Sequence, residues 1–95
     1  MTSKQRAYLR GLANTMDPIF QIGKTGLSDN LVKQLSDALE ARELIKITVL
    51  ETAPDTAKNF SLEIADQTNS TVIQVIGNKI TLFRQKKENS RYVLA

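Results

Sequence analysis

The sequence predicts a mixed α/β fold, in which three helices pack on a mixed four-stranded sheet in the order α-β-α-β-α-β-β. Two patterns support this prediction: apolar residues recur at helical spacing in three segments, and short β-rich runs alternate with those segments. In addition, 95 residues with 41% hydrophobic content are enough for one core. We therefore expect one domain over residues 1–95, with residues 85–95 forming either a flexible tail or a docked terminal strand.

The first predicted helix covers about residues 3–16, with Ser3 available as its N-cap. Its apolar positions recur every three or four residues; they are Tyr8, Leu9, Leu12 and Met16. Asp17-Pro18 ends this helix, because a residue that precedes proline resists helical dihedrals. A short strand over residues 19–22 follows and leads into the glycine loop Gly23-Lys24-Thr25-Gly26.

Ser28 is expected to cap the second helix, which begins with Asp29 near its positive end and stops near Arg42. One apolar stripe supports the helix; it consists of Leu31, Val32, Leu35, Ala38 and Leu39. Residues 44–50 are largely apolar and rich in β-branched side chains. They predict a central strand that is covered on at least one face.

Residues 54–68 predict the third helix, with Pro54 in its first turn. Its apolar stripe follows the helical period; it consists of Ala57, Phe60, Leu62, Ile64, Ala65 and Thr68. The last two strands, residues 71–76 and 79–84, flank Gly77-Asn78, a two-residue loop typical of a hairpin. We expect two β-α-β crossovers to give parallel pairings and the hairpin to give an antiparallel one.

The composition excludes several functional classes. The chain has neither Cys nor His, which removes thiol nucleophiles, disulfides, the usual zinc sites and the commonest general base. We therefore expect no catalytic residue, no cofactor and no metal site. No apolar run approaches the roughly 20 residues that span a bilayer, and the basic N-terminal segment has no apolar run after it. These features predict a cytoplasmic protein.

Charge is distributed unevenly along the chain. The net charge of +3 divides into +3 for residues 1–28, −4 for residues 29–66 and +4 for residues 67–95. A fold that brings the two basic ends together would present a positive face opposite a negative one, which suits a polyanionic partner. The alternative is that these charges only solvate the surface.

The glycine loop is the strongest candidate for a binding site. Gly23 and Gly26 would allow left-handed backbone and close approach to a ligand, while the N-terminus of the next helix attracts phosphate. KH modules clamp nucleotides with a G-x-x-G loop of this kind. The alternatives are an ordinary surface turn and a P-loop. The P-loop fails, because Pro18 stands where its first glycine is required.

Four separated blocks of the sequence resemble the CRM domain (chloroplast RNA splicing and ribosome maturation) in its stand-alone bacterial form, the YhbY-like proteins. The blocks are residues 9–13, 18–27, 43–47 and 76–84. The resemblance implies a fold like that of the C-terminal domain of bacterial initiation factor three. It also implies RNA binding through the glycine loop and neighbouring basic residues, and association with precursors of the large ribosomal subunit.

Two residues depart from the family pattern. Asn14 stands where the family often has histidine, and Phe83 stands where tyrosine is usual before Arg84. The first change removes a side chain that could stack or titrate, and the second removes a hydroxyl donor. They put in doubt any RNA contact from those two positions but leave the glycine loop unchanged.

The candidate RNA-binding residues are Gly23, Lys24, Thr25, Gly26, Arg6, Arg10, Lys79, Arg84, Lys86 and Lys87. Lys24 would meet phosphate as a point charge, whereas the Thr25 hydroxyl would bond phosphate or only stabilise the turn. Arg6 and Arg10 share a helix face and could reach one RNA strand, or could form a solvated face. Arg84 has an equally weighted structural interpretation, as the partner of Glu43 or another acid.

The leading functional hypothesis is a monomeric, non-enzymatic RNA-binding protein that assists ribosome assembly on structured precursor rRNA, with no membrane or small-molecule partner. A second hypothesis is an adapter whose basic face meets an acidic protein. Catalysis is the poorest hypothesis, because the carboxylates follow a helix periphery without a His, Cys or metal-ligand partner; they are Asp29, Asp37, Glu40 and Glu43. Few aromatic residues are available for base stacking, so phosphates and shape should dominate recognition.

Overall fold

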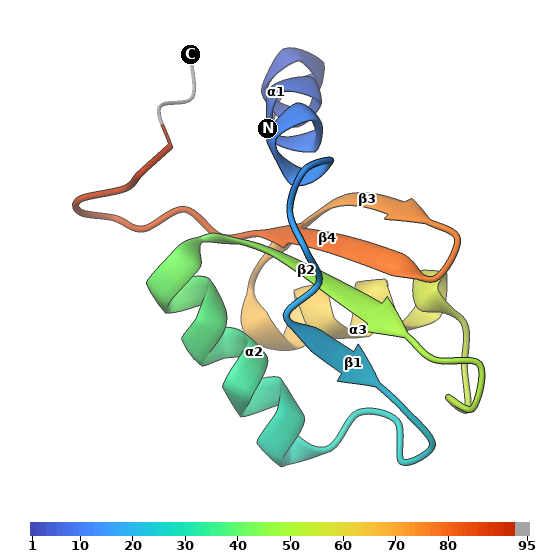
Figure 1. The fold of residues 1–95 in the computed structure, drawn as a ribbon. Helices are drawn as coiled ribbons and strands as arrows, with labels where there is room; N and C mark the ends of the chain where they lie inside the picture. Colours follow the sequence, from blue (N-terminus) through green and yellow to red (C-terminus); the bar gives the residue numbers. More distant parts are fainter. Residues whose placement is uncertain (93–95) are drawn as a thin grey trace.

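The computed structural model describes residues 1–92, and there it has three helices and a four-stranded sheet in the predicted order (Figure 1). The elements are α1 (Ser3–Ala13), β1 (Phe20–Ile22), α2 (Asp29–Arg42), β2 (Leu44–Val49), α3 (Ala57–Thr68), β3 (Thr71–Ile76) and β4 (Lys79–Phe83). The predicted fold class is therefore confirmed. Within the described residues, none of the helices combines the length and apolarity that crossing a membrane requires.

The strands lie in the order β1-β2-β4-β3. β1 pairs with β2 in parallel, as the first crossover predicts, and β4 pairs antiparallel with both β2 and β3. The expected second parallel pairing is wrong, because α3 connects two parallel strands, β2 and β3, that are not neighbours. The β3-β4 hairpin folds back so that β4, the last strand in sequence, occupies the place between them.

The helices cover the two faces of the sheet unequally (Figure 1). Alternate residues of β2 define the faces, since Ile45 and Ile47 join the core under α2 and α3, whereas Leu44 joins the core under α1. The first core is the larger one; its helical members include Leu35, Leu39, Phe60 and Ile64. The second consists of Leu9, Ala13, Leu44, Ile73 and Phe83. α1 therefore covers only part of the sheet face on which it packs.

α1 differs in detail from its prediction. Its N-cap is Thr2 rather than Ser3, and a capping box joins Thr2 to Gln5 through bonds of 2.9 and 3.1 Å. The helix buries only Leu9 and Ala13, while Tyr8 and Leu12 are 48% and 37% exposed. The predicted apolar stripe is too wide, because a helix that covers part of a sheet face buries only its central row.

α2 begins as predicted, with the Ser28 hydroxyl accepting from the Leu31 N–H at 3.1 Å. α3, by contrast, is capped by Thr56 and begins at Ala57, so Pro54 lies outside it. Leu62 is 60% exposed and does not belong to the buried stripe. Since it lies two residues from both Phe60 and Ile64, the helical period turns it away from the core.

Residues 85–92 form neither helix nor strand. The segment still returns to the domain, because the Tyr92 ring meets the Phe83 ring edge to face at a centroid distance of 5.5 Å. The alternative of a docked terminal strand involved Val93 and Leu94, which lie outside the described residues.

Candidate functional site

The glycine loop is a hydrogen-bonded turn. The Gly26 N–H donates to the Gly23 carbonyl at 2.9 Å, which places Lys24 and Thr25 at the two corners, both exposed. Among these residues only Gly26 has a positive φ, at 68°. A turn followed by a left-handed residue is the kind of main chain that forms an anion-binding nest, and α2 begins three residues later at Asp29. The loop therefore has a geometry that suits phosphate.

The two glycines are not equivalent. A Cβ at Gly26 would lie 3.1 Å from Cγ of Pro54, in addition to the left-handed strain. A Cβ at Gly23 would only touch Cδ1 of Leu50 at 3.7 Å, an ordinary contact. The prediction that backbone geometry requires glycine at both positions is thus supported at Gly26 but not at Gly23.

Lys79 lies at the same edge of the sheet as the glycine loop. Thr48 pairs with Gln21 of β1 on one side and with Lys79 of β4 on the other. Two main-chain bonds at the end of β2 connect the turns: Leu50 N–H to the Ile22 carbonyl at 2.9 Å and Val49 N–H to the Asn78 carbonyl at 2.7 Å. The fold therefore brings together the loop and Lys79, which are far apart in sequence.

Arg6 and Arg10 lie on α1, away from that edge, and they differ in their surroundings. Arg6 is half-buried and its Nη1 donates to the carbonyls of Val72 and Ile73, the latter at 3.2 Å, next to the irregularity in β3. Arg10 is exposed. Arg6 is therefore at least partly an anchor of α1, whereas Arg10 faces solvent.

Lys46 is a second anchor that the sequence analysis did not identify. Its Nζ donates to the carbonyls of Ala13 and Met16 at 3.1 and 3.4 Å, at the C-terminal end of α1. A cation there also suits the negative end of the helix. The signal in the sequence was a lone charge inside a largely apolar strand.

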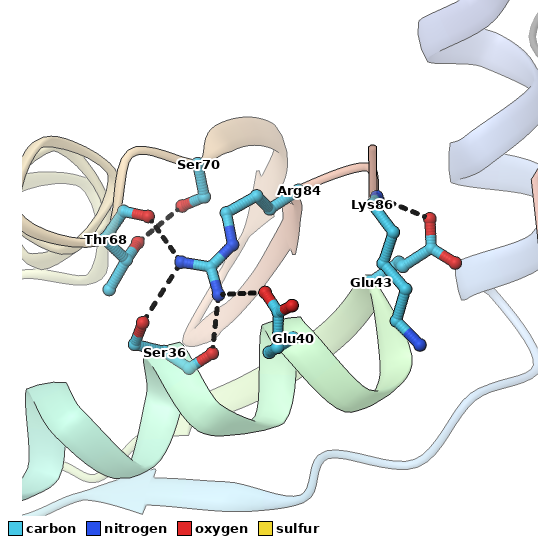
Figure 2. A network of polar contacts seen from close by, with 7 residues as sticks. All are labelled: Ser36, Glu40, Glu43, Thr68, Ser70, Arg84 and Lys86. Carbon is cyan, nitrogen blue, oxygen red and sulfur yellow. Dashed lines mark hydrogen bonds and ion pairs between the residues drawn. The ribbon is translucent and has the colours of Figure 1, made fainter. Parts of the chain in front are cut away.

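Arg84 lies at the opposite end of β4 and is engaged with the protein (Figure 2). Nη1 donates to Ser36 Oγ at 3.1 Å and to the Thr68 carbonyl at 2.8 Å. Nη2 donates to the Ser36 carbonyl at 2.7 Å and meets a Glu40 carboxylate oxygen at 3.4 Å. These contacts support the structural interpretation, with Glu40 rather than the side chain of Glu43 as the acidic partner.

Glu43 has a different role, which the sequence analysis missed. Its carboxylate accepts from the N–H groups of Lys86 and Arg91 and from the Ser90 hydroxyl. Burial alone would raise the pKa of Glu43, but these hydrogen bonds and the nearby Lys86 charge together hold it below its ordinary value of 4.5. The side chain therefore stays ionised although it is fully buried.

Lys86 and Lys87 follow Arg84 and line a concavity of about 670 Å³ together with it. This concavity lies beyond the C-terminal end of β4, whereas Lys79 and the glycine loop lie at the other end of the strand. The predicted site residues thus fall in three places. The end of the sheet next to the glycine loop (the loop end) has residues 23–26 and Lys79. Helix α1 has Arg6 and Arg10, and the opposite end of the sheet (the far end) has Arg84, Lys86 and Lys87.

Charge is segregated by layer. α1 and the four strands together contain five cations and no acid; the cations are Lys4, Arg6, Arg10, Lys46 and Lys79. α2 and α3, on the other face of the sheet, contain five acids and three cations. The fold therefore has a basic side and an acidic side, as the charge blocks along the chain suggested.

Together, the element order, the glycine loop and the basic side define a class of small α/β domains in which a basic side of a mixed four-stranded sheet lies opposite an acidic one. The chain belongs to the CRS1 / YhbY (CRM) domain family, whose profile matches residues 1–84. The resemblance seen in the sequence is thereby confirmed.

Similar proteins are known from several organisms. YqeI of Bacillus subtilis, named a probable RNA-binding protein, is 42% identical over 94 residues, covering 99% of this chain and 98% of its own. An RNA-binding protein of Haemophilus influenzae is 30% identical over 88 residues, covering 93% of this chain and 89% of the relative. The solution structure of a Staphylococcus aureus protein, described as a candidate RNA-binding protein, is 46% identical with a TM-score of 0.83, covering 100% and 99% of the two chains.

Proposed function

We propose that this protein binds structured RNA without catalysing a reaction, and that it acts on precursor rRNA during assembly of the large ribosomal subunit. The observation that supports this most strongly is the segregation of charge, with five cations and no acid in α1 and the sheet. RNA carries a dense line of negative charge, so a one-sided basic surface favours it over neutral partners. The names of the relatives agree with this choice.

The loop supplies the main contact in this proposal. Lys24 meets a phosphate as a mobile point charge, Gly26 shapes the turn, and Thr25 donates its hydroxyl to a phosphate oxygen. Gly23 leaves room for the RNA backbone to approach, since the protein itself does not require glycine there. Lys79 extends the contact along the same edge of the sheet.

The other candidates divide by their surroundings. Arg10 is exposed and reaches RNA directly, while Arg6 contributes the part of its guanidinium that does not anchor α1. Lys86 and Lys87 make a second contact at the far end of the sheet. Arg84 supports that end through its bonds to Ser36 and Thr68.

Recognition by shape and phosphates follows from the aromatic residues. Phe60 and Phe83 are buried, Phe20 and Tyr92 are half-buried, and Tyr8 is 48% exposed. No row of exposed rings exists in the described residues on which successive bases could stack. We propose accordingly that the chain acts as one monomeric domain in the cytoplasm, with weak sequence preference and no small-molecule substrate or membrane partner.

The test is sedimentation of tagged proteins from cell extract at controlled salt, followed by sequencing of the RNA that they carry. The loop variant is Gly23→Asp/Lys24→Glu, and the control is Lys33→Glu, which makes the same lysine-to-glutamate change at an exposed position on α2. We expect wild type and control to travel with large-subunit precursors and the folded loop variant to stay at the top of the gradient. If the loop variant also travels with the precursors, the loop is an ordinary turn and the adapter hypothesis gains.

A further inference from the structure

Glu43 occupies a costly position. It follows α2 directly, with φ 68° and ψ −47°, a conformation that side chains rarely adopt. It is also fully buried, which a carboxylate tolerates only where hydrogen bonds replace water. Both costs call for a compensating interaction, and the contacts of the carboxylate identify one.

The carboxylate of Glu43 holds a segment more than forty residues away. Oε2 accepts from the Lys86 N–H at 3.0 Å and from the Ser90 hydroxyl, and Oε1 accepts from the Arg91 N–H at 2.8 Å. The main-chain carbonyl of Glu43 adds a bond of 2.8 Å from the Arg84 N–H. One residue thus fixes both the start and the end of the segment. Figure 2 shows the contact at its start, with Lys86.

Within residues 1–92, few other interactions order this segment. Residues 85–92 contain no helix or strand, and their other hydrogen bonds are internal. These run from Gln85 Nε2 to the Tyr92 carbonyl at 3.0 Å and between Ser90 and Tyr92. In the described chain, the segment's hydrogen bonds to the rest of the domain converge on Glu43, and the Phe83 ring adds an apolar contact.

The ordered segment forms one wall of a groove. Arg84, Lys86 and Lys87 line a concavity of about 670 Å³, and a neighbouring one of about 530 Å³ shares Arg84 with it and reaches Met1 at the start of the chain. Glu40, which also lines the groove, is paired with Arg84. The two lysines are therefore the cations that remain for a ligand.

We propose that Glu43 is a positioning residue for a second RNA contact, holding residues 85–92 so that Lys86 and Lys87 face phosphates along this groove. The inference rests on the proposed RNA-binding function. Its physical basis is pre-organisation: a segment that is already ordered loses less conformational entropy when the lysines bind.

For Glu43→Gln, the proposal predicts a change in RNA binding opposite in sign to the change that loss of a negative charge alone would produce. Glu43→Gln removes a negative charge, which by itself would strengthen RNA binding, but the amide directs an NH₂ group at groups that are themselves donors. We expect binding of a structured rRNA fragment to weaken about threefold to tenfold, from the cost of ordering the main chain that carries the two lysines. The matched control is Glu88→Gln, which makes the same charge change at an exposed position of the groove and should leave binding unchanged or stronger.

A double-mutant cycle tests whether Glu43 acts through the lysines. Lys86→Gln/Lys87→Gln should lower the slope of log K against log salt by about 0.7 to 0.9 per phosphate contact in the wild-type background. It should lower the slope much less in the Glu43→Gln background. Equal losses in both backgrounds would overturn the positioning role.

Hydrogen exchange of the free protein provides a readout that does not depend on RNA. The amides of Lys86 and Arg91 should be protected in the wild type and in Glu88→Gln but exposed to exchange in Glu43→Gln, while core amides stay protected. Persistent protection in Glu43→Gln would contradict the proposal. Should Glu43→Gln fail to fold, Ser90→Ala removes one of the three contacts and should show the same changes at smaller size; no change in it would overturn the proposal.

The two proposals can fail separately. Suppose that the wild type binds RNA and that Lys24→Gln weakens the binding. If Lys86→Gln/Lys87→Gln then has no effect in either background, only the second contact is refuted. If the wild type does not bind the rRNA fragment, the proposed function fails and this inference with it.

Discussion

The two ends of the sheet use positive charge in opposite ways. At the loop end, Lys24 is exposed at the corner of a turn. At the far end, Arg84 makes four contacts with Ser36, Thr68 and Glu40. The comparison shows that the acceptors around a cation decide whether it stabilises the fold or remains available to a partner. We therefore expect substitution of Arg84 to affect stability and substitution of Lys24 to affect binding.

Arg84→Ala should produce the largest change in stability. It removes the charged donor that bonds to the Thr68 carbonyl at the end of α3 and to the hydroxyl and carbonyl of Ser36 on α2. Removing one partner of such charged hydrogen bonds costs about 2 to 3 kcal/mol. Lys24→Ala should change stability by less than about 0.5 kcal/mol, as exposed surface substitutions usually do. Urea unfolding of both variants measures this contrast. Equal stability of the two would remove the distinction between the ends.

A comparison of the two glycines sharpens the contrast within the loop itself. Gly26→Ala should lower stability by about 1 to 3 kcal/mol, because it forces alanine into a left-handed conformation and its Cβ toward Pro54. Gly23→Ala should stay within about 0.5 kcal/mol of wild type and yet weaken RNA binding. Thermal unfolding and RNA titration give the two values. A large stability loss at Gly23 would show that the protein, rather than a ligand, needs that glycine.

Acid should release the segment that Glu43 holds. Because the pKa of Glu43 is lowered in the folded protein, its stabilisation is fully present above the ordinary value of 4.5 and is lost as pH falls below it through the lowered pKa. We expect the Lys86 and Arg91 amides to lose protection over that range while core amides remain protected, as followed by hydrogen exchange.

The pKa of Asp55 is also lowered in the folded protein. The side chain of Asn59 and the N–H of Thr56 hydrogen-bond to its carboxylate and lower its pKa. The variant Asp55→Asn separates the contribution of Asp55 to the pH response from that of Glu43. If the tail amides keep the same pH response in Asp55→Asn, the response belongs to Glu43; a lost response would assign it to Asp55 instead.

The smallest expected effect is on the salt dependence of binding at the loop end. Lys24→Gln should lower the slope of log K against log salt by about 0.7 to 0.9, the value for one phosphate contact. Lys58→Gln on α3 gives a control on the acidic side of the molecule. A slope unchanged by Lys24→Gln would place the phosphate contact elsewhere, on Lys79 or α1.

The sequence predicted the local features of the fold well. The element order, the Ser28 cap and the hairpin turn at Gly77-Asn78 depend on residues a few positions apart, and all three match the structure. The place of β4 between β2 and β3 could not be predicted from the sequence. Strand order depends on pairings between residues more than 30 positions apart, such as Ile47 with Ile80. Periodicity carries no information about such pairings.

The candidate site was predicted only in part, again because some of its features are local in sequence and others depend on distant residues. The geometry of the glycine loop is local, and its turn could be anticipated from the residues themselves. The engagement of Arg84, by contrast, depends on α2 and on the end of α3. Glu43 was grouped with the acidic helix face, because nothing in its neighbours along the chain indicates that residues 86–91 return to it.

The central place of β4 has a consequence for how this protein matures on the ribosome. A nascent chain emerges from its N-terminus, and domains tend to fold as units once their parts are available. Here β2 has a partner on one side early, from β1, but its other side waits for residues 79–83. Until those residues emerge, β2 and β3 have no strand to join them, so the sheet should close only after β4 has emerged.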